Sequence, residues 1–140
     1  MILSRFLKPK WQHTDSATRQ KALRELDQAD PKLIELARQD LEPSVRRAAL
    51  ERLVDLDVLQ GSIDTDTDEG VRTTARSRHW DLLAGKIDNG PPLAERLERF
   101  RRDPNPELRD FLLQQAAEPE LRLAALERID LEATLVEITL

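Results

Sequence analysis

Apolar residues recur along the chain with the period of helices that are buried on one face. Leu50 and Leu53 follow Val45 at spacings of five and eight, and the positions between them are mostly charged or small. Segments that alternate polar with β-branched residues are scarce, so no strand is expected. Leu, Ala, Glu, Arg and Gln, which dominate the chain, favour helices. We therefore predict an all-α fold.

One of these helices is repeated in the sequence. Residues 42–53 nearly recur as residues 118–129, and looser copies stand at 15–26 and 68–75. Each copy begins with an acidic residue, which suits the free N–H groups and positive dipole end of a starting helix. Pro follows in the two closest copies, where its fixed φ fits the first helical turn. An irregular bundle of amphipathic helices would also have caps and Leu/Ala stripes, but the near-identity of two segments favours a repeat.

An arginine in each copy measures the period. Arg19, Arg46 and Arg72 are 27 and 26 residues apart, and Arg96 divides the longer interval to Arg122 into 24 and 26. This period holds two short helices, which cannot bury their apolar face alone and must stack on neighbours. We predict a single domain over residues 1–140, with units near 13–40, 41–66, 67–90, 91–105 and 106–130 and a trailing helix at 131–140. Two Gly and two Pro in residues 85–92 predict a long turn, or a unit that lost its first helix.

The repeated element resembles the second helix of HEAT repeats, because residues 42–50 read acidic-Pro-x-Val-Arg-x-x-Ala-Leu. The resemblance covers most of residues 13–130, is weakest over 76–105, and implies a right-handed α-solenoid of about four to five helix pairs. In that family an Asp in the turn between helices commonly pairs with the Arg of the second helix. The resemblance therefore implies structural pairs in this chain, each six residues apart: Asp40 with Arg46, Asp66 with Arg72, and Asp103 with Arg109. His13 and Ala116 stand at the matching place in the first and last units.

The N-terminal segment carries a second resemblance. Residues 6–13, followed by the first repeat, are similar to the start of a large bacterial family of uncharacterised proteins in which HEAT-like units precede a longer charged region. This implies that the chain is the first part of a longer one, in which a following unit would cover Leu131, Leu135 and Ile138. Arg5, Lys8, Lys10 and Trp11 are expected to cap the open end of the repeats, an interfacial anchor being the alternative.

Charge and composition narrow the function. The formal net charge of -5 argues against general binding of polyanions, which rests on Lys and Arg. The absence of Cys excludes disulfides, thiolate zinc sites and a cysteine nucleophile, and it fits a cytoplasmic protein. No apolar run is long enough to span a membrane.

One motif suggests metal chemistry. Residues 64–70 are similar to a calcium-binding loop, but the Gly falls one place late and Ala75 replaces the acidic ligand that closes such loops. We interpret the segment as an acidic turn that caps the next helix. His13 and His79 are the only histidines, and neither a nucleophile elbow nor a phosphate loop is present. The sequence thus predicts no enzyme, metal or cofactor.

The predicted function is a scaffold that binds a protein or peptide. Two alternatives stay open: a nucleic-acid-binding solenoid that uses a basic stripe of Arg76, Arg99 and Arg102, and a spacer arm without a ligand. Side chains expected on the partner-binding surface are Arg47, Glu51, Arg52, Arg76, Trp80, Arg99 and Arg102.

Overall fold

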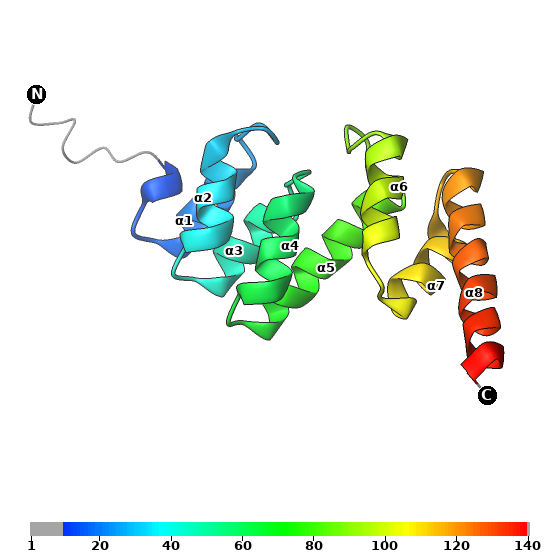
Figure 1. Ribbon diagram of the computed structural model, residues 1–140. Helices are drawn as coiled ribbons and strands as arrows, with labels where there is room; N and C mark the ends of the chain where they lie inside the picture. Colours follow the sequence, from blue (N-terminus) through cyan, green and yellow to red (C-terminus); the bar gives the residue numbers. More distant parts are fainter. Residues whose placement is uncertain (1–9, 140) are drawn as a thin grey trace, which may run out of the picture. The chain divides into compact units, whose positions relative to one another are not determined.

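The computed structural model describes residues 10–139, and all regular structure within them is helical (Figure 1). The prediction of an all-α fold is confirmed. The elements are η2 (Lys10–Gln12), α1 (Ser16–Leu23), α2 (Pro31–Gln39), α3 (Pro43–Leu50), α4 (Leu56–Thr65), α5 (Glu69–Leu83), α6 (Leu93–Arg102), α7 (Pro106–Gln115) and α8 (Pro119–Thr139). Arg5, Lys8 and residues 6–9, to which the sequence assigned a role, lie outside the described residues.

The chain divides into two compact units, and the boundary falls between Arg78 and His79, inside α5. In the first unit α1 packs against α3, while α2 packs against both α3 and α4. Val45, Leu50 and Leu53, the apolar face read from the sequence, are fully buried there.

The helices of the first unit begin where the sequence places caps. Asp30 accepts a hydrogen bond from the backbone N–H of Lys32, and Asp55 accepts one from that of Asp57. Pro31 and Pro43 stand in the first turn of α2 and α3, where no N–H is needed. Glu42 caps α3 without a side-chain hydrogen bond, so its contribution there is limited to its charge.

The second unit holds α6, α7 and α8, with α7 packed against α8. Phe100, Leu108, Leu112 and Leu121 are fully buried in it. The indole of Trp80 lies 5.4 Å from the ring of Phe111. Residues 84–92 form a long connection between α5 and α6, where the Gly and Pro content predicted a long turn over residues 85–92.

One predicted boundary needs correction. Residues 131–139 are not a separate trailing helix, because α8 continues from Pro119 to Thr139 without interruption. No Gly or Pro occurs between those limits to end it. Of the predicted units, residues 67–90 and 91–105 contain one helix each, α5 and α6.

Two glycines give opposite expectations for substitution by Ala. Gly85 has a φ of 75°, and a Cβ there would lie 2.6 Å from a guanidinium nitrogen of Arg96 and 3.0 Å from a carboxylate oxygen of Glu118. Gly85→Ala should therefore lower the free energy of unfolding by about 2 kcal/mol. Gly61 lies inside α4 with nothing within 4 Å of an added Cβ. Gly61→Ala should raise the free energy of unfolding by about 0.5–1 kcal/mol. Urea denaturation of both variants checks this, and equal effects would contradict the assigned backbone roles.

Candidate functional site

The arginine that marks each sequence repeat bonds the backbone of the preceding turn. In every case an Nη of the guanidinium donates to the carbonyl oxygen six residues earlier, at 2.7 Å. The bonds join Arg19 to His13, Arg46 to Asp40, Arg72 to Asp66, and Arg122 to Ala116. Because the acceptor is a main-chain oxygen, His13 and Ala116 serve as well as an Asp. This explains how the pattern persists where the sequence lacks the expected carboxylate.

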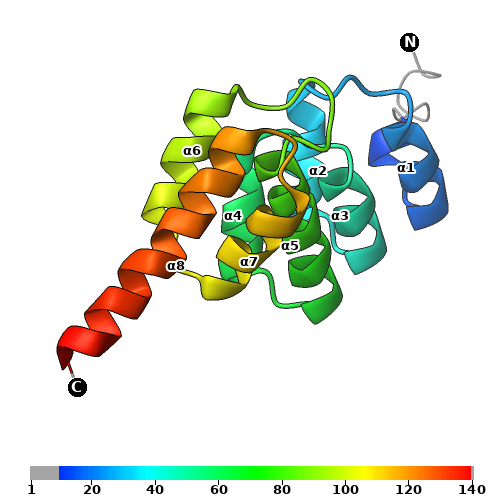
Figure 2. The same cartoon turned by 90° about the vertical axis from the view of Figure 1, so that its right-hand side faces the viewer.

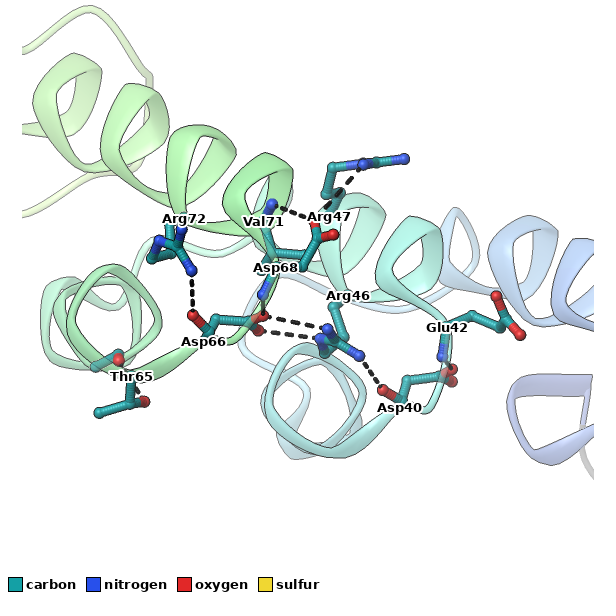
Figure 3. A network of polar contacts seen from close by, with 10 residues as sticks. Asp40, Glu42, Arg46, Arg47, Thr65, Asp66, Asp68, Val71 and Arg72 are labelled. Carbon is teal, nitrogen blue, oxygen red and sulfur yellow. Dashed lines mark hydrogen bonds and ion pairs between the residues drawn. The ribbon is translucent and has the colours of Figure 1, made fainter.

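The carboxylates of the turns bind the arginine of the preceding repeat. Arg46 donates from Nε and Nη2 to the two carboxylate oxygens of Asp66, at 3.0 and 3.1 Å (Figure 3). Arg19 binds Asp40 in the same forked manner, at 2.8 and 2.9 Å. The ion pairs therefore connect residues 20 or 21 apart, and the predicted pairs within one turn, Asp40 with Arg46 and Asp66 with Arg72, are formed through main-chain oxygens only.

Both aspartates are also tied to their own turns. Asp40 accepts a hydrogen bond from the N–H of Glu42, and Asp66 accepts one from the N–H of Asp68. Their side chains are 4% and 8% exposed. The hydrogen bond with Asp40 raises the pKa of Arg19 above its ordinary value. Each turn thus accepts charge-assisted hydrogen bonds from two arginines. The arginine of the preceding repeat binds the carboxylate, and the arginine six residues after the Asp binds its main-chain oxygen.

A second arginine row, which the sequence analysis missed, reaches backward along the chain. Arg52, Arg78 and Arg128 each follow the first arginine of their copy by six residues. They donate to main-chain oxygens 25 to 28 residues earlier: Arg52 to Leu26, Arg78 to Leu53, and Arg128 to Phe100 and Asp103. Arg52, predicted on the partner-binding surface, therefore holds the preceding repeat. The recurrence of Arg at this spacing in three copies is the signal that could have shown it.

In the second unit, Arg96 makes the same kind of contact. It donates to the carbonyl oxygen of Pro91 at 3.0 Å and to both carboxylate oxygens of Glu118, 22 residues later, at 2.8 and 2.5 Å. Arg96 is buried, and its hydrogen bonds lower the pKa of Glu118 below the ordinary 4.5. The degenerate unit that the period placed at Arg96 thus keeps the ion pair, with Glu118 in place of the turn Asp.

The predicted pair of Asp103 with Arg109 is not formed. Asp103 accepts a hydrogen bond from the N–H of Asn105, whereas Arg109 pairs with Asp110 and with Glu132 of α8. Arg109 lies in α7, the helix that precedes the repeated element in its unit, so it faces α8 instead of the turn behind it.

The residues predicted for a partner-binding surface serve several purposes. Glu51 and Arg76 are exposed. The guanidinium of Arg47 lies 3.9 Å from the carboxylate of Asp68. Trp80 is half-buried against Phe111, as a packing residue would be.

The predicted basic stripe is accompanied by acids. Arg99 lies 3.8 Å from Glu95, and Arg102 lies 2.5 Å from Glu98, in each case one turn earlier on α6. These contacts offset much of the positive charge that a nucleic acid would need.

The acidic turn at residues 64–70 has structural partners. Asp66 is bound by Arg46, and Asp68 accepts a hydrogen bond from the N–H of Val71 at 2.9 Å, at the start of α5 (Figure 3). Over residues 10–139, no group of three acidic or histidine side chains is placed to hold a metal ion. Nor does this part of the chain contain a helix with the length and apolar content to cross a membrane.

A hollow lies beside the arginine–aspartate ion pairs of the first unit. It has a volume of about 520 Å³ and is lined by Gln39, Leu41, Ser62, Thr65 and Thr67 together with the ion pair of Arg46 and Asp66. A second hollow of about 460 Å³ shares Leu41 and is lined on its other side by Trp11 and Glu35.

Leu41 departs from the repeat. Its side chain is 90% exposed, whereas the corresponding turn residues beside α1 and α5 are Thr14 and Thr67. An exposed Leu between two hollows is a side chain that a partner can bury. We therefore take Leu41 and the two hollows as the candidate binding site of the first unit.

No family model, curated protein or solved structure matches this chain. The arginine contacts and the exposed apolar side chains are thus the basis on which its function is inferred.

Proposed function

We propose that this chain is a scaffold of HEAT-like repeats, stacked as an α-solenoid, that binds a protein partner and is not an enzyme. The carrying observation is the recurring ion pair of Arg19 with Asp40, Arg46 with Asp66, and Arg96 with Glu118. Contacts that recur at the same place in successive repeats support an arrangement in which each unit is bonded to its neighbour. The arginines and carboxylates of these pairs stabilise turns. They do not converge on one point, as catalytic groups would.

The candidate binding site is the exposed Leu41 with its two hollows. A protein segment could bury the Leu side chain and meet the polar groups of Gln39, Thr65 and Thr67 beside it. An apolar anchor within a polar rim is the usual composition of a protein interface. A cytoplasmic location belongs to the same proposal and rests on the absence of Cys.

Leu41→Thr tests this proposal, because Thr is the residue at this place in the copies that begin α1 and α5. We expect the tagged wild-type chain to capture a protein from a lysate of its native cells, with and without nuclease. Leu41→Thr should weaken this capture about tenfold, which corresponds to about 1.4 kcal/mol and suits the loss of one buried Leu contact. The melting temperature should stay the same, since the side chain is exposed.

The other outcomes each contradict the proposal. Equal capture by wild type and Leu41→Thr would exclude Leu41 as a contact. Capture that nuclease abolishes would indicate a nucleic-acid partner, and its affinity should then fall steeply with salt. If the tagged chain captures neither protein nor nucleic acid, the result would favour a spacer arm without a ligand.

A further inference from the structure

A second exposed surface lies on α8 in the other unit. The C-terminal half of α8 runs beyond the end of α7 in both views (Figures 1 and 2). Leu123, Leu131 and Ile138 are spaced eight and seven residues apart, so they lie on one side of the helix. Their side chains are 55%, 60% and 76% exposed. We call these three residues the α8 stripe.

The stripe is distinct from the face by which α8 packs in its own unit. Leu121 and Ala125 are fully buried, and Arg128 and Glu132 follow them on the same face at helical spacing. Arg128 donates to the main-chain oxygens of Phe100 and Asp103, while Glu132 pairs with Arg109. Up to Glu132 the packing face is therefore already engaged, and the α8 stripe lies on another side of the helix.

The exposed charges beside the stripe after Leu123 have one sign. Glu127, Asp130 and Glu137 are exposed on this part of α8. Arg128 is the only basic residue from position 123 to 139, and its guanidinium lies 3.7 Å from the Phe100 ring inside the unit. An apolar stripe bordered by carboxylates complements a surface that combines apolar and basic side chains.

We propose that the α8 stripe docks a basic amphipathic helix of a partner protein, an inference that rests on the proposed scaffold function and names a partner class for it. From Leu123 to Ile138 the stripe extends over about 22 Å, the length of a four-turn helix. Leu or Ile side chains of the partner would cover the stripe, while its Lys and Arg would meet Glu127, Asp130 and Glu137. A second copy of this chain is disfavoured as the occupant, because pairing two α8 helices would oppose the same carboxylates.

Two synthetic helices of roughly 18 residues, about five turns, serve as probes. One carries Leu on one face and Lys on the other, and the second has Glu in place of Lys. Fluorescence anisotropy with the full chain should show that the Leu–Lys helix binds at least tenfold more tightly. Leu131→Ser with Ile138→Ser should weaken its binding at least tenfold, and Asp130→Lys with Glu137→Lys should shift the preference toward the Leu–Glu helix.

A matched control separates the stripe from the net charge. Glu25→Lys with Glu69→Lys changes the charge equally at exposed positions of the first unit that lie outside both binding surfaces, and it should leave the preference unchanged. Leu41→Thr should also bind the Leu–Lys helix as tightly as the wild type does. Loss of binding at the α8 stripe can therefore be told apart from loss of binding at the Leu41 site.

Three results would overturn the proposal. The first is equal binding of both probes or of neither. The second is a preference that Glu25→Lys with Glu69→Lys shifts as strongly as the change of Asp130 and Glu137 on α8. The third is sedimentation of the wild type as a dimer that Leu131→Ser with Ile138→Ser dissociates, which would make a second copy the occupant.

Discussion

Replacing Arg46 with Ala is expected to lower the free energy of unfolding by about 3 kcal/mol, because it leaves a nearly buried carboxylate without its cation. The guanidinium binds both oxygens of Asp66 and the main-chain oxygen of Asp40, and the Asp66 side chain is 8% exposed. For a chain of this size the melting temperature should fall by roughly 10 °C. Thermal and urea denaturation followed by circular dichroism measure both quantities.

The neighbouring arginine supplies the control. Arg47 is 43% exposed at its side chain and contacts Asp68 at 3.9 Å, so Arg47→Ala should cost less than about 0.5 kcal/mol. Arg46→Lys should recover only part of the loss, because an ammonium group cannot bind two oxygens in a fork and reach a third. Equal losses for Arg46→Ala and Arg47→Ala would contradict the role assigned to Arg46.

A loss of similar size is expected for Arg96→Met in the second unit. The Met keeps much of the apolar stem but removes the donors to Glu118, Pro91 and Leu83, and the free energy of unfolding should fall by about 3 kcal/mol. Arg101→Met, on an exposed position of the same helix, should change it by less than about 0.5 kcal/mol. If both variants unfold at the same urea concentration, the buried ion pair does not stabilise this unit.

The same pair predicts a dependence on pH. Hydrogen bonding to Arg96 lowers the pKa of Glu118 in the folded chain below its ordinary 4.5. The stabilisation is therefore complete above about pH 4.5 and is lost as the pH falls through the lower, folded pKa. The difference in stability between wild type and Glu118→Gln should be largest at neutral pH and should shrink in acid. A difference that grows in acid would contradict the assignment.

Much of the local structure can be predicted from single residues and their spacing. The period of Val45, Leu50 and Leu53 indicates a buried helical face, and that face is fully buried. Pro31 and Pro43 mark the first turns of two helices. These features depend on neighbours within one or two turns of the chain, for which sequence spacing is sufficient information.

The partners of the arginines depend on the third dimension and could not be predicted in the same way. Asp40 lies six residues before Arg46 and Asp66 lies twenty after it, and spacing cannot tell which carboxylate the guanidinium reaches. The turn places the carbonyl oxygen of Asp40, not its carboxylate, within reach of Arg46. Main-chain acceptors such as Leu26 leave no trace in residue identity, so only the recurrence of Arg at the position of Arg52 in other copies could have indicated its role.

The surface residues were the least predictable. Leu41 differs from the Thr of its counterparts, but a substitution in one repeat has no meaning until its exposure is known. Leu131 and Ile138 could be recognised from the sequence as apolar residues that need a cover, but the assignment of residues 131–140 to a separate helix hid their alignment with Leu123.

A double-mutant cycle on Arg46 and Asp66 most directly tests whether ion pairs between repeats hold this fold together. The free energy of unfolding is measured for the wild type, Arg46→Ala, Asp66→Ala and the double variant. We predict a coupling energy of about 2 kcal/mol, with the double variant little less stable than either single one. Effects that add to within about 0.5 kcal/mol would show that the two residues act independently, and the proposed link between repeats would have to be abandoned.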